Sequence, residues 1–205
     1  MNRPGPGAGA GLRWLLVAVA VGFWPMQASA HLVTTGLGPF YDGISHFFLS
    51  LDDVLPVVAM AILGGLQGRR GGRQVLFALP VAWLVGGLAG YFAGGPEVAR
   101  GIAAVSALVV GVLVAADRRL APAVVLGLAC ALGLLHGWMN GASVSAAKRG
   151  SLALPGIATS VFVTVALVSA LVIGMRAPWL RIAARVAGSW IAAVGLLLLG
   201  WSLRR

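Results

Sequence analysis

Acidic residues and histidines are scarce in this chain. Its 205 residues include five acidic residues and three histidines, against fifteen lysines and arginines. Cysteine occurs once, as Cys130, inside an apolar run. A single cysteine excludes a disulfide within the chain and a metal site built from several cysteines, and its simplest interpretation is a small buried hydrophobe.

The chain consists mainly of long apolar runs and has few charged residues. Hydrophobic residues make up 60% of the chain and charged residues 10%, far from the composition of a soluble domain. The runs lie near residues 43–66, 74–94, 98–116, 120–138, 154–175 and 181–202. Each is close to the ~20 residues that a helix needs to cross a bilayer. We therefore predict an all-α fold, a polytopic membrane helix bundle with six transmembrane helices in one domain, residues 31–205.

The first thirty residues have the layout of an export signal. Arg3 and Arg13 form a basic start, an apolar core follows from Leu15 to Phe23, and Ala28-Ser29-Ala30 is a small-residue cleavage site. We predict a cleaved signal peptide, residues 1–30, which makes His31 the first residue of the mature chain. The alternative is an uncleaved first helix.

The basic residues indicate orientation rather than nucleic-acid binding. They come in twos and threes between the apolar runs, without the basic stripe of a nucleic-acid surface. Eight of them follow or flank the ends of the first, third and fifth predicted spans: Arg69, Arg70, Arg73, Arg118, Arg119, Arg176, Arg181 and Arg185. Because lysine and arginine concentrate on the cytoplasmic side, we expect the mature N-terminus outside, and the lipid bilayer is the expected partner.

Glycine and tryptophan suggest how the helices pack. The chain has thirty glycines, and pairs such as Gly86-Gly87 within the predicted spans would let helix backbones approach closely. Four tryptophans lie near predicted span ends or loops: Trp83, Trp138, Trp179 and Trp201. We interpret them as anchors at the membrane interface.

The first predicted span carries a histidine and two acids. Ionisable groups in hydrocarbon cost at least ~2.5 kcal/mol each, so they are candidates for function. The spacing of four, four and three places these residues on one face of an unbroken helix: Asp42, His46, Ser50 and Asp53. The rise of ~1.5 Å per residue separates His46 from Asp53 by about 10 Å. One ion can therefore contact both only if the helix breaks or other helices supply ligands, and no break is evident between His46 and Asp52.

Asp52 and Asp53 also stand next to each other. Two adjacent acids cannot neutralise each other, and one would tend to stay protonated. This favours a metal or proton pathway over the alternative, a buried ion pair between His46 and Asp52 that holds helices together.

A second polar pair closes the fourth predicted span. His136 and Asn140 are four residues apart and would share a helix face. Glu97, before the third span, is a further acid near the outer surface. Imidazole combined with carboxylate or amide oxygen suits divalent nickel, cobalt or zinc. His136 could equally form a hydrogen bond between helices.

The order of these features resembles the HupE/UreJ family, over essentially the whole mature chain. The resemblance rests on His46 and Asp52 in the first span, Leu79-Pro80 in the second, Glu97 before the third, and His136-Gly137 with Gly141 closing the fourth. Members are bacterial inner-membrane proteins associated with hydrogenase and urease, and are regarded as nickel or cobalt permeases. The resemblance implies the same location and multi-pass arrangement here.

This sequence departs from the family pattern at four positions. The family's His-Pro-x-x-Gly-x-Asp-His has Phe47, Ser50 and Asp53 here in place of proline, glycine and the last histidine, and the second histidine of His-Gly-x-x-His-Gly is Asn140. Two of four motif histidines are therefore oxygen ligands, which implies a shift toward cobalt, manganese or zinc.

These features lead to three hypotheses. The first is a permease that supplies nickel or cobalt for hydrogenase or urease maturation, with no resident cofactor. Capture would use His31, Asp42 or Glu97, and a midplane site would use His46, Asp52, Asp53, His136 and Asn140. The second is a non-transporting accessory protein that binds metal or scaffolds metalloenzyme maturation proteins. The third, an intramembrane enzyme, lacks a companion nucleophile motif, so we do not expect an enzyme.

Overall fold

The computed structural model describes residues 35–94, 100–175 and 177–204. Over these residues the chain is helix and connecting loop, without a strand. The chain divides into two units, Met1–His31 and Leu32–Arg205. The predicted signal peptide, His31, Glu97 and Arg176 lie outside the described residues.

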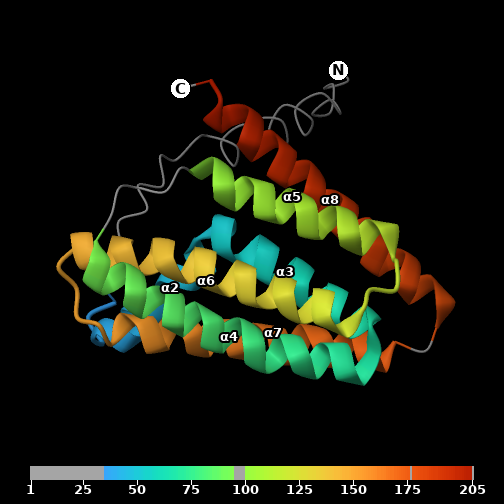
Figure 1. Cartoon of the computed structure of the whole chain (residues 1–205), viewed down its shortest axis with the longest axis horizontal. Helices are drawn as coiled ribbons and strands as arrows, with labels where there is room; N and C mark the ends of the chain where they lie inside the picture. Colours follow the sequence, from blue (N-terminus) through green and yellow to red (C-terminus); the bar gives the residue numbers. More distant parts are fainter. Residues whose placement is uncertain (1–34, 95–99, 176, 205) are drawn as a thin grey trace, which may run out of the picture. The chain divides into compact units, whose positions relative to one another are not determined.

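Figure 1 shows the helices of the described part of the chain. They are α2 (Pro39–Leu49), α3 (Leu51–Leu66), α4 (Gly68–Ala93), α5 (Arg100–Ala116), α6 (Pro122–Ala146), α7 (Ala153–Gly174) and α8 (Pro178–Ser202). The all-α membrane bundle is confirmed, but the count of six spans is not. In the described residues α4, α6, α7 and α8 are long and apolar enough to cross a membrane, and α2 with α3 makes a fifth span if the bent pair counts as one. Helix α5 is apolar but has only 17 residues.

The first predicted span is broken, which corrects the expectation of an unbroken helix. Helices α2 and α3 meet at Ser50 with a bend of 76°, and Ser50 has an extended backbone (φ −94°, ψ 91°). Its N–H donates to the carbonyl of His46 at 3.0 Å, and its own carbonyl accepts the N–H of Asp53 at 2.9 Å. Serine is a favoured residue at a helix start. The break was missed because no proline or glycine marks it.

Polar contacts bring three connections together at one end of the helices. The Gln67 side chain, between α3 and α4, donates to the carbonyl of Arg118 and accepts the N–H of Leu120, each at 3.0 Å. In the same loop, Asp117 accepts two hydrogen bonds from Arg181 of α8, at 2.6 and 2.9 Å. We call this the basic end, because it brings together the loop that holds Arg118 and Arg119 and the first turn of α8, which holds Arg181. Its cytoplasmic location stays a prediction.

Glycines set the close approach of neighbouring helices. On α6, a Cβ added at Gly133, Gly137 or Gly141 would collide with the backbone of α4. On α8, a Cβ at Gly195 would lie 2.6 Å from the backbone nitrogen of Leu108 in α5, and Figure 1 shows α5 and α8 side by side. The α4 and α6 backbones therefore pack directly against each other along this face of α6.

Candidate functional site

Three polar residues from two helices meet inside the bundle. Asp53 lies in the first turn of α3, and His136 and Asn140 lie one turn apart on α6. His136 Nδ1 is 2.8 Å from Asp53 Oδ1, and Asn140 Nδ2 donates to Asp53 Oδ2 at 3.0 Å. All three side chains are buried. With Ser106 they form what we call the Asp53 cluster.

Ser106 of α5 completes the cluster. Its Oγ lies 2.8 Å from His136 Nε2 and 2.7 Å from the carbonyl oxygen of Ala103. The carbonyl accepts only, so the hydroxyl proton is directed either to Ala103 or to His136. When the His136 ring is neutral, its Nε2 accepts a hydrogen bond from the Ser106 hydroxyl. When the ring is protonated, Nε2 donates to Oγ, and the hydroxyl then donates to the carbonyl of Ala103. Both ring nitrogens of His136 therefore keep a hydrogen-bond partner whether the ring is neutral or protonated.

The Asn140 side chain is oriented by two acceptors. Its Nδ2 donates to Asp53 Oδ2 and also to the carbonyl of His136, at 2.9 Å. Since both partners are acceptors, the amide cannot be turned round, and Oδ1 points elsewhere. Oδ1 is buried and makes no hydrogen bond within the described residues. The His46 ring of α2 lies close enough to Asn140 and Asp53 to interact with both side chains.

Aromatic rings cover one side of the cluster. The Trp83 ring lies against His136, with centroids 5.4 Å apart and planes inclined by 32°. Phe47 contacts Trp83 edge to face at 6.3 Å. Trp83 is 1% exposed and sits in the middle of α4, so its interpretation as an interfacial anchor was wrong. In contrast, Trp179 and Trp201, near the two ends of α8, are exposed, and their role as interfacial anchors stays a prediction.

The structure separates Asp42 from Asp53, the two acids that the sequence placed on one helix face, and it also separates Asp53 from its neighbour Asp52. Asp53 joins the cluster, while Asp52 is exposed. Asp42 instead belongs to a group at the end opposite the basic end. There its Oδ1 accepts hydrogen bonds from the N–H and hydroxyl of Thr35, at 2.6 and 2.7 Å, and its Oδ2 accepts one from Arg149 at 3.0 Å. The Tyr91 hydroxyl donates to the carbonyl of Arg149 at 3.4 Å. Asp42 is thus buried and paired.

The second polar pair lies within a helix. Helix α6 runs to Ala146, beyond the predicted end at residue 138. His136 and Asn140 are therefore in its interior, which corrects the prediction that they close a span. Sequence reasoning also missed Ser106 and the packing role of Trp83. The signal for Ser106 was present, because it is the only polar residue between Gly101 and Ala116.

The cluster offers mixed donors for a cation. No group of three His, Cys, Asp or Glu side chains able to hold a metal ion exists among the described residues. The Asp53 cluster instead combines a carboxylate, an imidazole, a hydroxyl and an amide oxygen. Borderline divalent ions accept such nitrogen and oxygen donors. Each donor except Asn140 Oδ1 is already hydrogen bonded within the cluster.

The order Ser106, His136, Asp53 is also that of a serine hydrolase triad. Ser106, however, lies in the interior of α5, where the helix uses the backbone N–H groups around it. Such groups cannot then stabilise an oxyanion, which a hydrolase requires. The arrangement is therefore better suited to holding a cation or a proton than to acyl transfer.

Comparison with known proteins gives one family. A sequence model described as HupE / UreJ protein matches residues 19–198, a range that includes the whole of α2 to α7 and most of α8. No curated protein and no solved structure matches the chain.

Proposed function

This chain belongs to the HupE/UreJ family, and from that premise we propose that it carries a divalent transition-metal ion, nickel or cobalt, inward across the bacterial inner membrane. Family membership supports an accessory or metal-transport role. Transport is favoured by the Asp53 cluster, which places polar groups inside an apolar bundle.

The observation that carries this proposal is the buried oxygen of Asn140. A buried acceptor without a hydrogen bond costs roughly 1–3 kcal/mol. Among the described residues Asn140 Oδ1 is such an acceptor, and it belongs to a side chain whose Nδ2 donates to the Asp53 carboxylate, which also contacts the His136 ring. A divalent cation would satisfy the Asn140 oxygen, and the carboxylate and imidazole beside this side chain are further ligand types that such an ion accepts.

The hydrogen bonds within the cluster favour weak binding, which a transported ion needs in order to be released. A transport site has to bind strongly enough to admit the ion and weakly enough to release it. An arriving ion would compete with Ser106 for His136 Nε2 and with His136 and Asn140 for Asp53. We propose that Asp53, His136, Asn140 and His46 contact the ion in passage. Because the ion competes with hydrogen bonds for these side chains, their affinity for the ion is limited.

Asp42 has a different role in this proposal. Both of its oxygens accept hydrogen bonds from Thr35 or Arg149, so it is better suited to hold the segment at Thr35 against the α6–α7 loop than to capture metal. Capture by His31 or Glu97 stays a prediction.

The membrane potential is a sufficient energy source. An inward movement of a doubly charged ion gains ~4.6 kcal/mol per 100 mV, at ~2.3 kcal/mol per charge. The sequence contains no Gly-x-x-x-x-Gly-Lys phosphate loop, which agrees with a carrier driven by a gradient.

An accessory role is the second candidate. It is favoured by the completeness of the cluster, in which both ring nitrogens of His136 and both oxygens of Asp53 already have partners. Such a network could hold α3, α5 and α6 together in a scaffold for metalloenzyme maturation.

The test is accumulation of radioactive nickel and cobalt in cells that produce the protein. We expect Asp53→Asn and His136→Ala to lose accumulation at matched membrane abundance. The matched control is Asp117→Asn, which changes an acid at the basic end that pairs with Arg181, and which should keep accumulation. Asp52→Asn tests the acid that the family motif indicates, whereas Asp53→Asn tests the acid that the structure places in the cluster. We expect a smaller loss of accumulation for Asp52→Asn because Asp52 is exposed.

Two results would contradict transport. Accumulation no higher than in cells without the protein would favour the accessory role. Accumulation that persists in both cluster variants would mean that the ion does not pass through the Asp53 cluster.

A further inference from the structure

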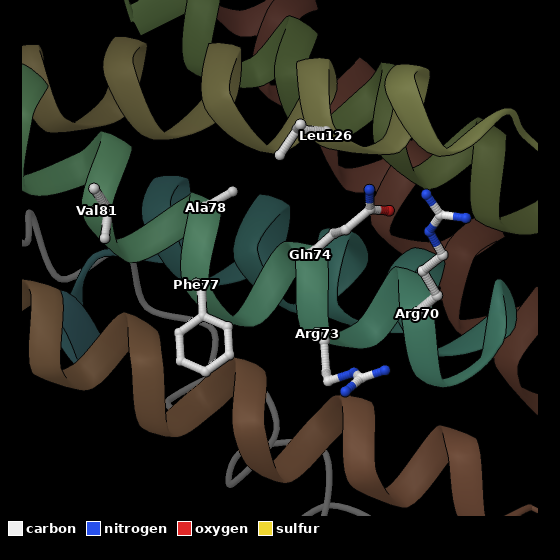
Figure 2. A pocket seen from close by; sticks show the side chains of 7 residues that line it. All are labelled: Arg70, Arg73, Gln74, Phe77, Ala78, Val81 and Leu126. Atoms are coloured by element: carbon white, nitrogen blue, oxygen red, sulfur yellow. The ribbon is translucent and has the colours of Figure 1, made fainter.

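A shallow groove of about 580 Å³ runs along the outer face of α4. Figure 2 shows it from close by, with Arg70, Gln74, Phe77 and Val81 following each other along α4. Leu126 of α6 forms the opposite wall. The groove lies outside the Asp53 cluster and plays no part in the proposed transport.

The groove is polar at one end and apolar over the rest. Arg70 and Arg73 lie in the first two turns of α4, next to the basic end. Phe77, Val81 and Leu126 follow, and all three are exposed. From Arg73 to Val81 the helix rises about 12 Å at 1.5 Å per residue. A charged end followed by an apolar channel matches the layout of a phospholipid, with its phosphate first and its acyl chain behind.

Within the described residues, no acidic side chain neutralises the charge of the groove. Arg181 pairs with Asp117 and Arg149 pairs with Asp42, whereas Arg70 and Arg73 form no ion pair among the described residues. No acidic residue lines the groove. In its wall, the Gln74 side-chain oxygen is buried and has no hydrogen-bond partner within the described part of the chain.

From these observations we propose that the groove is a binding site for an anionic phospholipid. Arg70 and Arg73 hold the phosphate, and one acyl chain lies along Phe77, Val81 and Leu126. Basic pockets between helices near the cytoplasmic surface recognise anionic headgroups in this way. The occupant is a bilayer lipid, because the apolar part of the groove faces outward from a membrane helix.

The experiment compares lipid retention by the purified full-length protein in detergent, measured by native mass spectrometry with added phosphatidylglycerol or phosphatidylcholine. The wild-type protein should retain phosphatidylglycerol preferentially. Arg70→Gln combined with Arg73→Gln should weaken that retention about 30-fold. Each of the two arginines is expected to contribute what one basic residue contributes near an anionic surface, and the variant loses both contributions. The matched control, Arg118→Gln with Arg119→Gln, removes two exposed charges from the same end outside the groove and should retain phosphatidylglycerol like the wild type.

A second variant tests the apolar part without changing the charge. Ala78→Trp fills the groove beside Leu126 and keeps both arginines, so it should lower phosphatidylglycerol retention even if the arginine variant does not insert. If the groove variant and the Arg118→Gln, Arg119→Gln control lost phosphatidylglycerol retention equally, the effect would be one of general charge, and the proposal would be overturned. Equal retention of the two lipids by the wild-type protein would overturn it as well.

Discussion

Replacement of Gly137 by alanine tests the packing that holds His136 in place. Gly137 lies on α6 directly after His136, where the helix touches α4. An added Cβ would collide with the carbonyl of Trp83 and would stand 2.9 Å from the backbone nitrogen of Gly87. These are main-chain atoms, which cannot rotate out of the way as a side chain would. The two helices must therefore separate or the chain must distort.

The size of the effect follows from two opposing terms. Overpacking a close contact costs about 1–3 kcal/mol, and the collision here is with rigid backbone, so the upper part of that range applies. Alanine regains about 1 kcal/mol of helix propensity over glycine. We expect a net loss of about 2 kcal/mol for Gly137→Ala. Gly127, on the same helix, has no atom within 4 Å of its added Cβ, so Gly127→Ala should be neutral or stabilising by up to about 1 kcal/mol.

The assay is thermal unfolding of both variants in one detergent, followed by circular dichroism. A chain of this size loses about 2–4 °C in Tm per kcal/mol, so Gly137→Ala should unfold roughly 4–8 °C below the wild type while Gly127→Ala does not. Metal accumulation should also fall in Gly137→Ala, because His136 moves relative to Asp53. Equal Tm values for the two variants would refute the direct backbone contact between α4 and α6.

Two further predictions concern the cluster itself. Ser106→Ala leaves His136 Nε2 without a partner in the described residues and should cost roughly 1–3 kcal/mol in unfolding free energy. Ser189→Ala, which removes an exposed hydroxyl bonded only to its own helix, is the control and should cost little, and equal losses would contradict the cluster. Asn140→His places the family's histidine beside Asp53 and should raise nickel accumulation relative to cobalt, because imidazole favours nickel. Lower nickel accumulation at equal membrane abundance would contradict a role for position 140 in binding.

The candidate site was predicted from the sequence in part. Asp53, His136 and Asn140 were all named, because polar groups in apolar runs are expensive and therefore conspicuous. Their assembly was not predictable. Asp52 and Asp53 are equivalent neighbours in the sequence, and the family motif points to Asp52, yet Asp53 is the one that reaches His136. The direction of each side chain depends on the bend at Ser50, which the local sequence does not mark.

The sequence by itself determined the class of the protein. Apolar runs long enough to cross a bilayer and the order of the motif residues led to a helical membrane protein of the HupE/UreJ type, because hydropathy and motif spacing are properties of the chain alone. The tertiary structure decided which residues meet. Ser106 and Trp83 became partners of His136, and α6 continued to Ala146, because close glycine contacts between α4 and α6 and the packing of α5 bring distant residues together. Contacts of this kind depend on the surfaces of several helices at once, and no local pattern records them.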